Sequence, residues 1–284
     1  MRGGAGEELP SVSVIANTAK PEAVSIAERI VAYLSGEGIE FVLEEELAKA
    51  LNRPGDGVPL RSMRTDLLVI VGGDGTILRA CLDLPDDAPP IMAVNAGERG
   101  FLTTVEPSEV KEALRAFFEG RVEVEERMRL EARIGSTALP KALNEVCLTS
   151  KVPAKLFKAR VRKNGAEMCW VEGDGLLVAT PAGSTAYSLS CGGPVVDPGL
   201  RCLLLTPICP VRPSWPFVLP PNAEVEVEVV RAREPVAVVD GQAVFELEVG
   251  SVVCVRASER PLRFVGLRAR FYEKLARRGS GPHA

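Results

Sequence analysis

Residues 68–79 read Leu-Val-Ile-Val-Gly-Gly-Asp-Gly-Thr-Ile-Leu-Arg, and they carry the clearest structural signal in the first half of the chain. The continuous apolar run 68–71 is typical of a strand that is covered on both faces of a sheet. Apolar residues at Ile77, Leu78 and Cys81 have the spacing of a helix that begins just after the glycines. The stretch therefore predicts a strand, a glycine turn that carries one carboxylate, and a helix.

Three glycines, Gly72, Gly73 and Gly75, flank Asp74 in this turn. Because glycine has no β-carbon, the backbone can turn sharply, and a phosphate or ribose can approach its N–H groups. The helix from Thr76 onward points its N-terminus at the turn, and such an end favours anions. The simpler alternative is a turn in which Asp74 only caps the helix. Three glycines around one acid favour a phosphate-handling site, although the stretch is neither a Walker A loop nor a G-x-G-x-x-G fingerprint.

Strands and helices alternate on both sides of this turn. The patterns predict strands at 11–16, 39–43 and 90–94, helices at 21–36, 44–51 and 108–118, and a loop at 52–61. This alternation predicts a doubly wound, Rossmann-like parallel sheet in an α/β domain of residues 1–120. In such sheets ligands bind beyond the carboxyl ends of the strands, where Asp74 is expected to lie.

The periodicity changes at about residue 121. Short alternating or β-branched segments occur at 122–124, 158–162, 224–230, 236–239, 245–249 and 252–255. Asn164-Gly165 is a typical hairpin turn. Many short strands with turn signals predict an antiparallel, β-sandwich-like domain over residues 121–265. For residues 266–284 we expect a helix at 267–278, packed back on the N-terminal domain, and a tail from 279 onward.

The composition narrows the possible classes of function. The chain has 284 residues, a formal net charge of −4, and 46% hydrophobic and 25% charged residues, which suits a globular protein of two modest domains. This charge gives no reason to expect a nucleic acid as partner. Apolar runs are far shorter than a membrane span, so we expect no membrane partner. Residues 1–8 lack the apolar core of a signal peptide, and we therefore expect a cytoplasmic protein.

The cysteines and the single histidine limit the chemistry further. Seven cysteines are scattered without a Cys-x-x-Cys pair, and His283 lies at the C-terminal end. We therefore expect no metal site made by the protein itself. A Ser–His or Cys–His catalytic pair is excluded, so a general base must be a carboxylate, a lysine or a tyrosine.

Two further strand ends carry polar or aromatic residues. After the strand at 90–94, Asn95 and two glycines form an open loop, in which Phe101 either presents its ring to a base or packs in the core. Asn144 and Glu145 form a polar pair on an otherwise apolar strand. This pair either satisfies a strand end or holds ribose hydroxyls, which need both a donor and an acceptor.

Residues 171–194 are unusual for a β domain, because glycines and hydroxyl-bearing residues dominate them. Asp174 lies between two glycines, and a buried strand and a loop of small residues follow. Small side chains would let a planar base approach the backbone, with Thr185, Tyr187 and Ser190 as hydrogen-bonding groups. The alternative, a tight turn packed on the sheet, accounts less well for the length of this run.

Together these motifs resemble those of the NAD kinase family. In chain order they are Gly-Gly-Asp-Gly-Thr from 72, Asn-x-Gly-x-x-Gly-Phe-Leu from 95, Asn-Glu from 144, Gly-Asp-Gly from 173 through Thr-Ala-Tyr from 185, Leu-Thr-Pro-Ile from 205 and Asp-Gly-Gln from 240. The first motif is also found in diacylglycerol kinases, sphingosine kinases and phosphofructokinases. The block at 173–194 is the most specific to the family.

The resemblance implies transfer of the terminal phosphoryl group of ATP, or of polyphosphate in some members, to the adenosine-ribose 2′-hydroxyl of NAD, giving NADP. It also implies Mg²⁺ or another divalent cation with the ATP, and a homodimer or homotetramer. Phosphoryl transfer needs alignment, charge neutralisation and a group that accepts the hydroxyl proton. A carboxylate on a glycine turn, with Mg²⁺ carried by the nucleotide, provides these without a histidine.

The resemblance assigns roles to individual residues. It makes Asp74 the base or orienting carboxylate, and it makes Gly72, Gly73, Gly75 and Thr76 the phosphate-donor loop. Contacts to the substrate are implied for Gly75, Arg79, Phe101, Asn144, Glu145, Lys155, Asp174, Ala182, Thr185, Ala186, Tyr187, Ser190 and Gln242.

Two segments depart from the family pattern: Arg99 replaces an apolar residue, and the proline-rich residues 209–216 lack the usual His-Ser type of sequence. Two other functions share some of the features. A lipid kinase of the diacylglycerol type would have the glycine turn without needing the Thr-Ala-Tyr loop, and a dinucleotide sensor would bind NAD or NADP without turnover. Donor choice, acceptance of NADH, oligomer size, feedback by NADP and the role of residues 209–216 depend on geometry or on partner chains.

Overall fold

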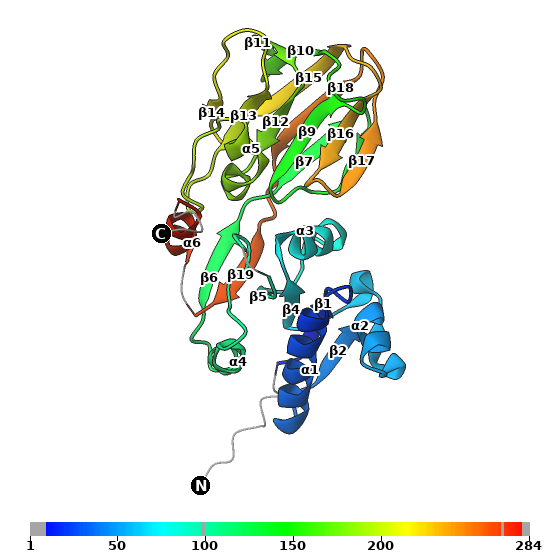
Figure 1. The fold of residues 1–284 in the computed structure, drawn as a ribbon, viewed down its shortest axis with the longest axis vertical. Coiled ribbons are helices and arrows are strands. Elements are labelled where there is room, and N and C mark those ends of the chain that lie inside the picture. The colour runs from blue at the N-terminus through cyan, green and yellow to red at the C-terminus, as the bar shows by residue number, and fades with distance from the viewer. Residues whose placement is uncertain (1–9, 98–99, 268–269, 280–284) are drawn as a thin grey trace. The chain divides into compact units, whose positions relative to one another are not determined.

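The computed structural model describes residues 10–97, 100–267 and 270–279 (Figure 1). Arg99 and the predicted tail beyond residue 279 lie outside these residues. The chain divides into two compact units. The first comprises Met1–Ala80, Asp87–Glu125 and Arg263–Ala284, and the second comprises Cys81–Asp86 and Glu126–Leu262.

The first unit is built on a seven-stranded sheet with the order β3-β2-β1-β4-β5-β19-β6. Its strands are β1 (Val12–Ala16), β2 (Phe41–Glu44), β3 (Gly57–Val58), β4 (Leu67–Gly72), β5 (Ile91–Asn95), β6 (Glu123–Arg127) and β19 (Leu262–Gly266). The pairings that link β3, β2, β1, β4, β5 and β19 are parallel. This arrangement confirms the α/β class that the alternating pattern predicts.

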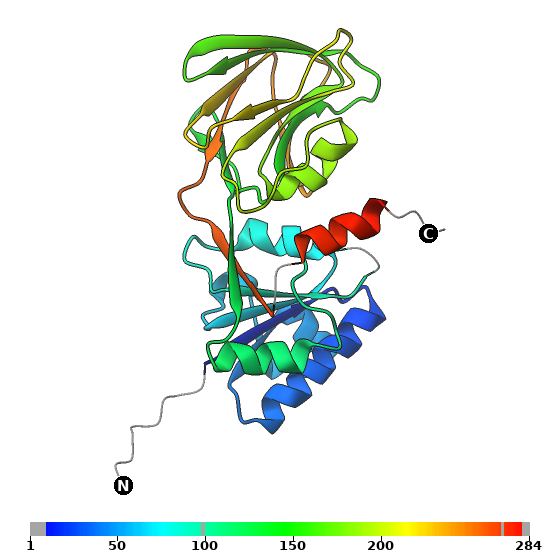
Figure 2. The same cartoon turned by 90° about the vertical axis from the view of Figure 1, so that its left-hand side faces the viewer.

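Helices α1 (Pro21–Gly36) and α4 (Val110–Phe118) run side by side on one face of this sheet, in blue and green in Figure 2. In α1 the buried residues Ile26, Ile30 and Leu34 recur with helical spacing and pack on the strands. The other helices of the chain's described part are α2 (Glu45–Ala50), α3 (Asp74–Asp83), α5 (Tyr187–Ser190) and α6 (Phe271–Gly279). The predicted strands and the helices α2 and α4 of this unit occur with their ends shifted by only one or two residues.

Three strands of this sheet, β3, β6 and β19, differ from the predicted organisation. Strand β6 and all of β19 except Gly266 fall within residues 121–265, which were expected to be part of the β-rich domain, yet both strands join the first sheet. Alternation shows that a segment is a strand, but it does not show which sheet the strand joins. The expected loop at 52–61 contains β3, which pairs with β2 and is too short to give a periodic signal.

The last helix, α6, is part of the first unit, and residues at its start contact other segments of that unit. Arg270 pairs with Glu109, with 2.5 Å between Nη2 and Oε1, and Lys274 Nζ donates to the carbonyl oxygen of Thr103. Lys274 Nζ also lies 3.4 Å from the carbonyl oxygen of Phe101. The helix is therefore anchored to the loop that follows β5.

The second unit is a sandwich of two six-stranded sheets, with the orders β11-β10-β15-β18-β7-β8 and β14-β13-β12-β9-β16-β17. Their strands are β7 (Leu130–Ile134), β8 (Thr137–Ala138), β9 (Glu145–Ser150), β10 (Phe157–Lys163), β11 (Ala166–Gly173), β12 (Gly175–Ala179), β13 (Leu203–Ile208), β14 (Phe217–Leu219), β15 (Glu224–Arg231), β16 (Pro235–Val239), β17 (Ala243–Glu246) and β18 (Val252–Ala257). Neighbouring strands are antiparallel, and both sheets contribute to one core, as Leu148 and Val178 of one sheet and Val227 of the other illustrate. The predicted β-sandwich is confirmed.

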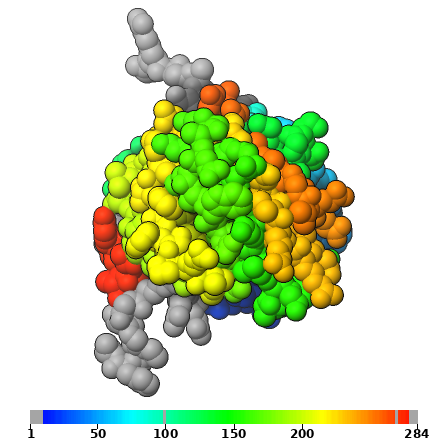
Figure 3. Space-filling view, turned by 90° about the horizontal axis from the view of Figure 1, so that it is seen from above, coloured from blue at the N-terminus to red at the C-terminus, as the bar shows by residue number. Residues whose placement is uncertain are grey.

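The hairpin between β10 and β11 turns at Asn164 and Gly165, with φ of 51° and 79°. Two successive positive φ angles are those of a type I′ turn, which confirms the predicted hairpin. The space-filling view shows the surface of this unit, with earlier segments in green and later ones in yellow and orange (Figure 3). Among the described residues, every helix is too short or too polar to cross a bilayer.

Candidate functional site

The glycine turn joins the carboxyl end of β4 to the start of α3. A β-carbon on Gly72 would lie 2.5 Å from Oγ1 of Thr76, so only glycine allows this close approach of strand and helix. At Gly73 and Gly75 a β-carbon would meet nothing within 4 Å, so the backbone there is open to a ligand. The N-terminus of α3 adds a partial positive charge. The turn therefore has the features of an anion-binding backbone.

The carboxylate of Asp74 is held by a loop that lies 27 residues further along the chain. Its Oδ2 accepts a hydrogen bond from the backbone N–H of Phe101 at 3.0 Å, and its Oδ1 accepts one from Leu102 at 2.9 Å. These two bonds orient the half-buried carboxylate, and each oxygen retains a lone pair for a substrate hydroxyl. The loop that contains Phe101 thus positions Asp74.

Two neighbouring strand ends contribute polar groups to the same edge of the sheet. Asn17 follows β1 and donates from Nδ2 to Oγ1 of Thr76 at 3.4 Å. Asn95 ends β5 and accepts from the N–H of Gly97 at 3.1 Å. Lys20 Nζ lies 3.8 Å from the position that a β-carbon on Gly97 would occupy. Asn17 and Lys20 were missed because only the strand order places β1 beside β4.

In the second unit, Asp240 holds the backbone of the polar pair. Its Oδ2 accepts from the N–H of Leu143 at 2.7 Å, and its Oδ1 accepts from Asn144 at 2.8 Å and from Glu145 at 2.9 Å. Asn144, Glu145 and Asp240 are only 6%, 7% and 3% exposed. The motif Asp-Gly-Gln was noted in the sequence, but nothing local indicated that its aspartate reaches residues almost a hundred positions away.

Two atoms of the pair are buried without a protein partner. Among the residues that the structure describes, Asn144 Oδ1 and Glu145 Oε2 have no hydrogen-bond partner. Burial, and then the charge of Asp240, raise the pKa of Glu145 from 4.5 to about 8. Glu145 therefore carries a proton at neutral pH and can donate a hydrogen bond, while Asn144 offers an acceptor. A ligand with adjacent hydroxyls would satisfy both.

The raised pKa values predict how stability depends on pH. Burial also raises the pKa of Asp240 from 3.8 to about 6. A carboxyl group with a raised pKa stabilises the fold fully below its unfolded value, and this contribution is lost as the pH rises through the folded value. For Glu145, this stabilising contribution is lost as the pH rises from 4.5 to about 8.

Between pH 4.5 and about 8 we therefore expect the free energy of unfolding of the wild type to fall. In Glu145→Gln the fall should be smaller by a few kcal/mol, because the amide does not titrate. Denaturant unfolding at a series of pH values measures the difference. The exposed Glu248→Gln serves as control and should follow the wild type. Equal pH slopes for Glu145→Gln and the wild type would contradict the prediction.

The loop after β12 packs directly on the polar pair. Thr180 Oγ1 donates to the carbonyl oxygen of Leu143 at 2.6 Å and accepts from the N–H of Gly183 at 3.1 Å. The N–H of Thr180 donates to the carbonyl oxygen of Asn144 at 2.8 Å. A β-carbon on Gly183 would lie 2.2 Å from that same oxygen. The loop and the pair therefore form one structure.

The other predicted residues of this unit differ in their exposure. Ala182 and Ala186 are half-buried, and Thr185 is buried, with Oγ1 bonded to the carbonyl oxygen of Ala182 at 3.3 Å. Tyr187 and Ser190 are exposed on α5. The remaining predicted residues, all exposed on other segments, are Asp174 between β11 and β12, Gln242 after β16 and Lys155 before β10.

Two other exposed features complete the description. Arg79 lies exposed on α3, in the first unit. In the proline-rich segment 209–216 of the second unit, Trp215 is 73% exposed. Among the described residues, no group of three or more His, Cys, Asp or Glu side chains is arranged to hold a metal ion.

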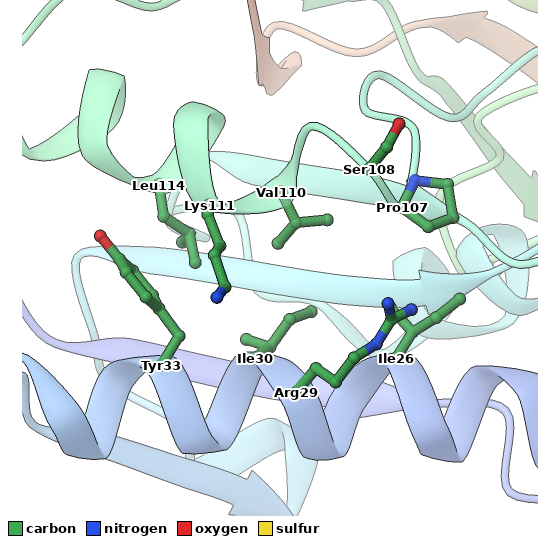
Figure 4. A pocket seen from close by; sticks show the side chains of 9 residues that line it. All are labelled: Ile26, Arg29, Ile30, Tyr33, Pro107, Ser108, Val110, Lys111 and Leu114. Atoms are coloured by element: carbon green, nitrogen blue, oxygen red, sulfur yellow. The ribbon is translucent and has the colours of Figure 1, made fainter.

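A separate groove lies between α1 and α4 (Figure 4). Its volume is about 160 Å³, and Ile26, Ile30 and Leu114 are among its apolar lining residues, with Arg29 and Lys111 also facing it. Pockets for cofactors are usually about 300 Å³ or larger. The groove is therefore too small for a dinucleotide.

Both units match known protein families. Residues 12–122 match the ATP-NAD kinase N-terminal domain, and residues 143–267 match the ATP-NAD kinase C-terminal domain. An NAD kinase of Methanothermobacter thermautotrophicus is 38% identical over 267 residues, which cover 93% of this chain and 94% of that protein. An NAD kinase of Pyrococcus abyssi is 35% identical over 269 residues, which cover 93% and 97%.

Solved structures show the same arrangement of elements. The crystal structure of yeast NADH kinase complexed with NADH has a TM-score of 0.88 and 25% identity, and covers 98% of this chain and 89% of that chain. The crystal structure of an NAD kinase from Archaeoglobus fulgidus in complex with ATP has a TM-score of 0.75 and 32% identity, and covers 95% and 100%.

An α/β unit with a glycine turn, joined to a β-sandwich in one chain, defines a two-domain kinase. The match to the NAD kinase family model includes the β-sandwich, residues 143–267. The similarity is therefore not limited to the glycine turn, which lipid kinases also have. The chain belongs to the NAD kinase family, and it is a kinase.

Proposed function

We propose that the protein transfers the terminal phosphoryl group of ATP to the 2′-hydroxyl of the adenosine ribose of NAD, giving NADP. The observation that carries this proposal is the carboxylate of Asp74, oriented by the N–H groups of Phe101 and Leu102 beside the open backbone of the glycine turn. The bound ATP and NADH of the two related structures support the choice of donor and acceptor. Mg²⁺ would arrive with the ATP, since this ion usually takes few ligands from the protein.

Each part of the site has a role in this reaction. Asp74 orients the ribose hydroxyl and accepts its proton, because a hydroxyl becomes a better nucleophile as the proton leaves. The backbone of Gly73 and Gly75 lies against the phosphates, and the cationic side chains of Lys20 and Arg79 balance their charge.

The dinucleotide contacts require both a polar and a flat surface. Asn144 and protonated Glu145 supply an acceptor and a donor for ribose hydroxyls. In the second unit, the small residues around Ala182 surround the adenine and Tyr187 contacts the ribose. In the first unit, Phe101 offers its ring to a base. The other assigned contacts are Lys155, Asp174, Thr185, Ala186, Ser190 and Gln242.

The test is NADP formation from NAD with ATP and Mg²⁺, followed with a dehydrogenase that accepts only NADP. That enzyme recognises the 2′-phosphate, so its signal reports the position of phosphorylation as well as the rate. Parallel reactions with polyphosphate and with NADH identify the preferred donor and acceptor. If NADP forms only with polyphosphate, then polyphosphate and not ATP is the phosphoryl donor. Tight NADP binding without turnover by either donor would overturn the proposal in favour of a dinucleotide sensor.

A further inference from the structure

Residues 143–145 are held from both sides by backbone hydrogen bonds. On one side, the strand pairing between β16 and β9 ends at Val239 and Val146, and the N–H of Asp240 then donates to the carbonyl oxygen of Glu145 at 3.0 Å. Beyond the end of this strand pairing, the Asp240 carboxylate accepts hydrogen bonds from the N–H groups of Leu143, Asn144 and Glu145. On the other side, Thr180 donates hydrogen bonds from its hydroxyl to the carbonyl oxygen of Leu143 and from its N–H to the carbonyl oxygen of Asn144. The backbone polar groups are thus satisfied without the side chains of the pair.

A carboxylate is the group that suits this position. Its two oxygens accept all three N–H bonds, whereas the amide of an asparagine would turn its NH₂ group toward one of these donors. Asp240 also has a positive φ of 51°, a conformation that aspartate and asparagine adopt more readily than other residues with a side chain. Burying an ionised group is unfavourable unless it is hydrogen-bonded, and the three N–H groups of residues 143–145 supply these bonds to Asp240.

We infer that Asp240 is a positioning residue for the dinucleotide, because it holds the Leu143–Glu145 backbone in place and leaves the buried atoms Asn144 Oδ1 and Glu145 Oε2 for the substrate. This inference rests on the proposed function. The two unpartnered atoms lie on residues more than nine-tenths buried, and the substrate satisfies them when it binds.

Asp240 acts on Glu145 through its charge as well. Among the residues that the structure describes, the thiols of Cys147, on the same strand, and of Cys191, which follows α5, also interact electrostatically with Glu145. Burial raises the pKa of both thiols, to about 12 for Cys147, so both are neutral near pH 8. Asp240 is therefore the charge that favours the protonated form of Glu145.

The surroundings of Asp240 do not cancel this charge. Asp240 itself faces the thiol of Cys81, whose pKa burial raises to about 12. The arginines Arg127 and Arg129 act on Cys81. The three backbone N–H groups favour the ionised form of Asp240. The pair of acids thus shares one negative charge at neutral pH, and this charge is on Asp240.

The experiment compares the KM for NAD and the kcat of the full chain from about pH 6 to about 9.5 in the wild type, Asp240→Asn and Glu145→Gln. In the wild type we expect the KM to rise by about tenfold per pH unit above about pH 8, as Glu145 loses its proton. In Asp240→Asn the rise begins about one pH unit lower, and the KM at neutral pH increases by about tenfold with a much smaller change in kcat. In Glu145→Gln the alkaline rise disappears, because the amide keeps a donor at every pH.

A uniformly raised KM with the wild-type pH profile in Asp240→Asn would show a merely structural role and overturn the inference. If that variant does not fold, Glu145→Gln decides alone: an alkaline rise that persists there overturns the inference. Asp86→Asn removes another acid of the same unit, paired with Lys141 at 2.6 Å, and should keep the wild-type profile. Calorimetric NAD binding over the same pH range separates the two proposals. A wild type that binds no NAD contradicts the proposed function. If the wild type binds NAD normally but Asp240→Asn has the same pH profile of KM as the wild type, only the role of Asp240 is contradicted.

Discussion

In Asp74→Asn we expect NADP formation to fall by about a thousandfold or more while NAD still binds. An amide cannot accept the proton of the ribose hydroxyl. Its NH₂ group would also face one of the two backbone N–H donors of Phe101 and Leu102, so the carboxylate orientation would be lost as well. The rate is measured with the NADP-specific dehydrogenase, and binding by calorimetry with NAD.

The exposed Asp87 of the same unit provides a control with the same chemical change. Asp87→Asn should keep full activity. Retained turnover in Asp74→Asn would exclude this residue as the base, and a sensor would show unchanged binding with no activity to lose. A parallel loss of NAD binding and of activity would assign Asp74 to substrate binding instead.

Gly183→Ala should produce the second large effect, on both stability and NAD affinity. The added β-carbon would lie 2.2 Å from the carbonyl oxygen of Asn144 and 2.6 Å from its carbonyl carbon. These are backbone atoms, so relief requires the loop and the strand to separate. That movement breaks the bonds of Thr180 to Leu143 and Asn144. We expect a loss of about 3 kcal/mol in the free energy of unfolding.

Because the polar pair moves with the loop, we also expect the KM for NAD to rise by about tenfold or more. Denaturant unfolding and steady-state kinetics measure the two effects. Gly36→Ala, at the end of α1, is the matched control, since a β-carbon there meets nothing within 4 Å. That variant should be neutral or slightly stabilised. Wild-type stability of Gly183→Ala would contradict the close packing of the loop on the pair.

The candidate site residues of the first unit and those of the second unit were predictable to different degrees. Around Asp74, three glycines beside an apolar run indicate a strand, a turn and a helix, so the position of the carboxylate followed from local pattern. Its hydrogen bonds to Phe101 and Leu102 did not, because they join segments with no shared periodicity. The residue type of Phe101 points only to its aromatic ring, whereas in the structure its backbone N–H also donates to Asp74.

In the second unit the polar pair Asn144 and Glu145 was predictable from the residue types, but the protonation state of Glu145 was not. Asn144 and Glu145 were identified as a polar pair on an apolar strand. That Glu145 is protonated depends on its burial and on Asp240, which the chain brings to it from 95 residues away. Burial and charge proximity are properties of the folded chain, so no local motif reports them.

Local sequence patterns predicted the elements: the strand–turn–helix at 68–79, the hairpin turn at Asn164-Gly165, and the change from helical to β periodicity near residue 121. These follow from local preferences of backbone and side chains, which act over a few residues. The tertiary structure decided that β19 joins β5 in the first sheet and that Asp240 holds the Asn144–Glu145 backbone. Both are pairings between distant segments, and such pairings depend on which surfaces can be buried together once the whole chain folds.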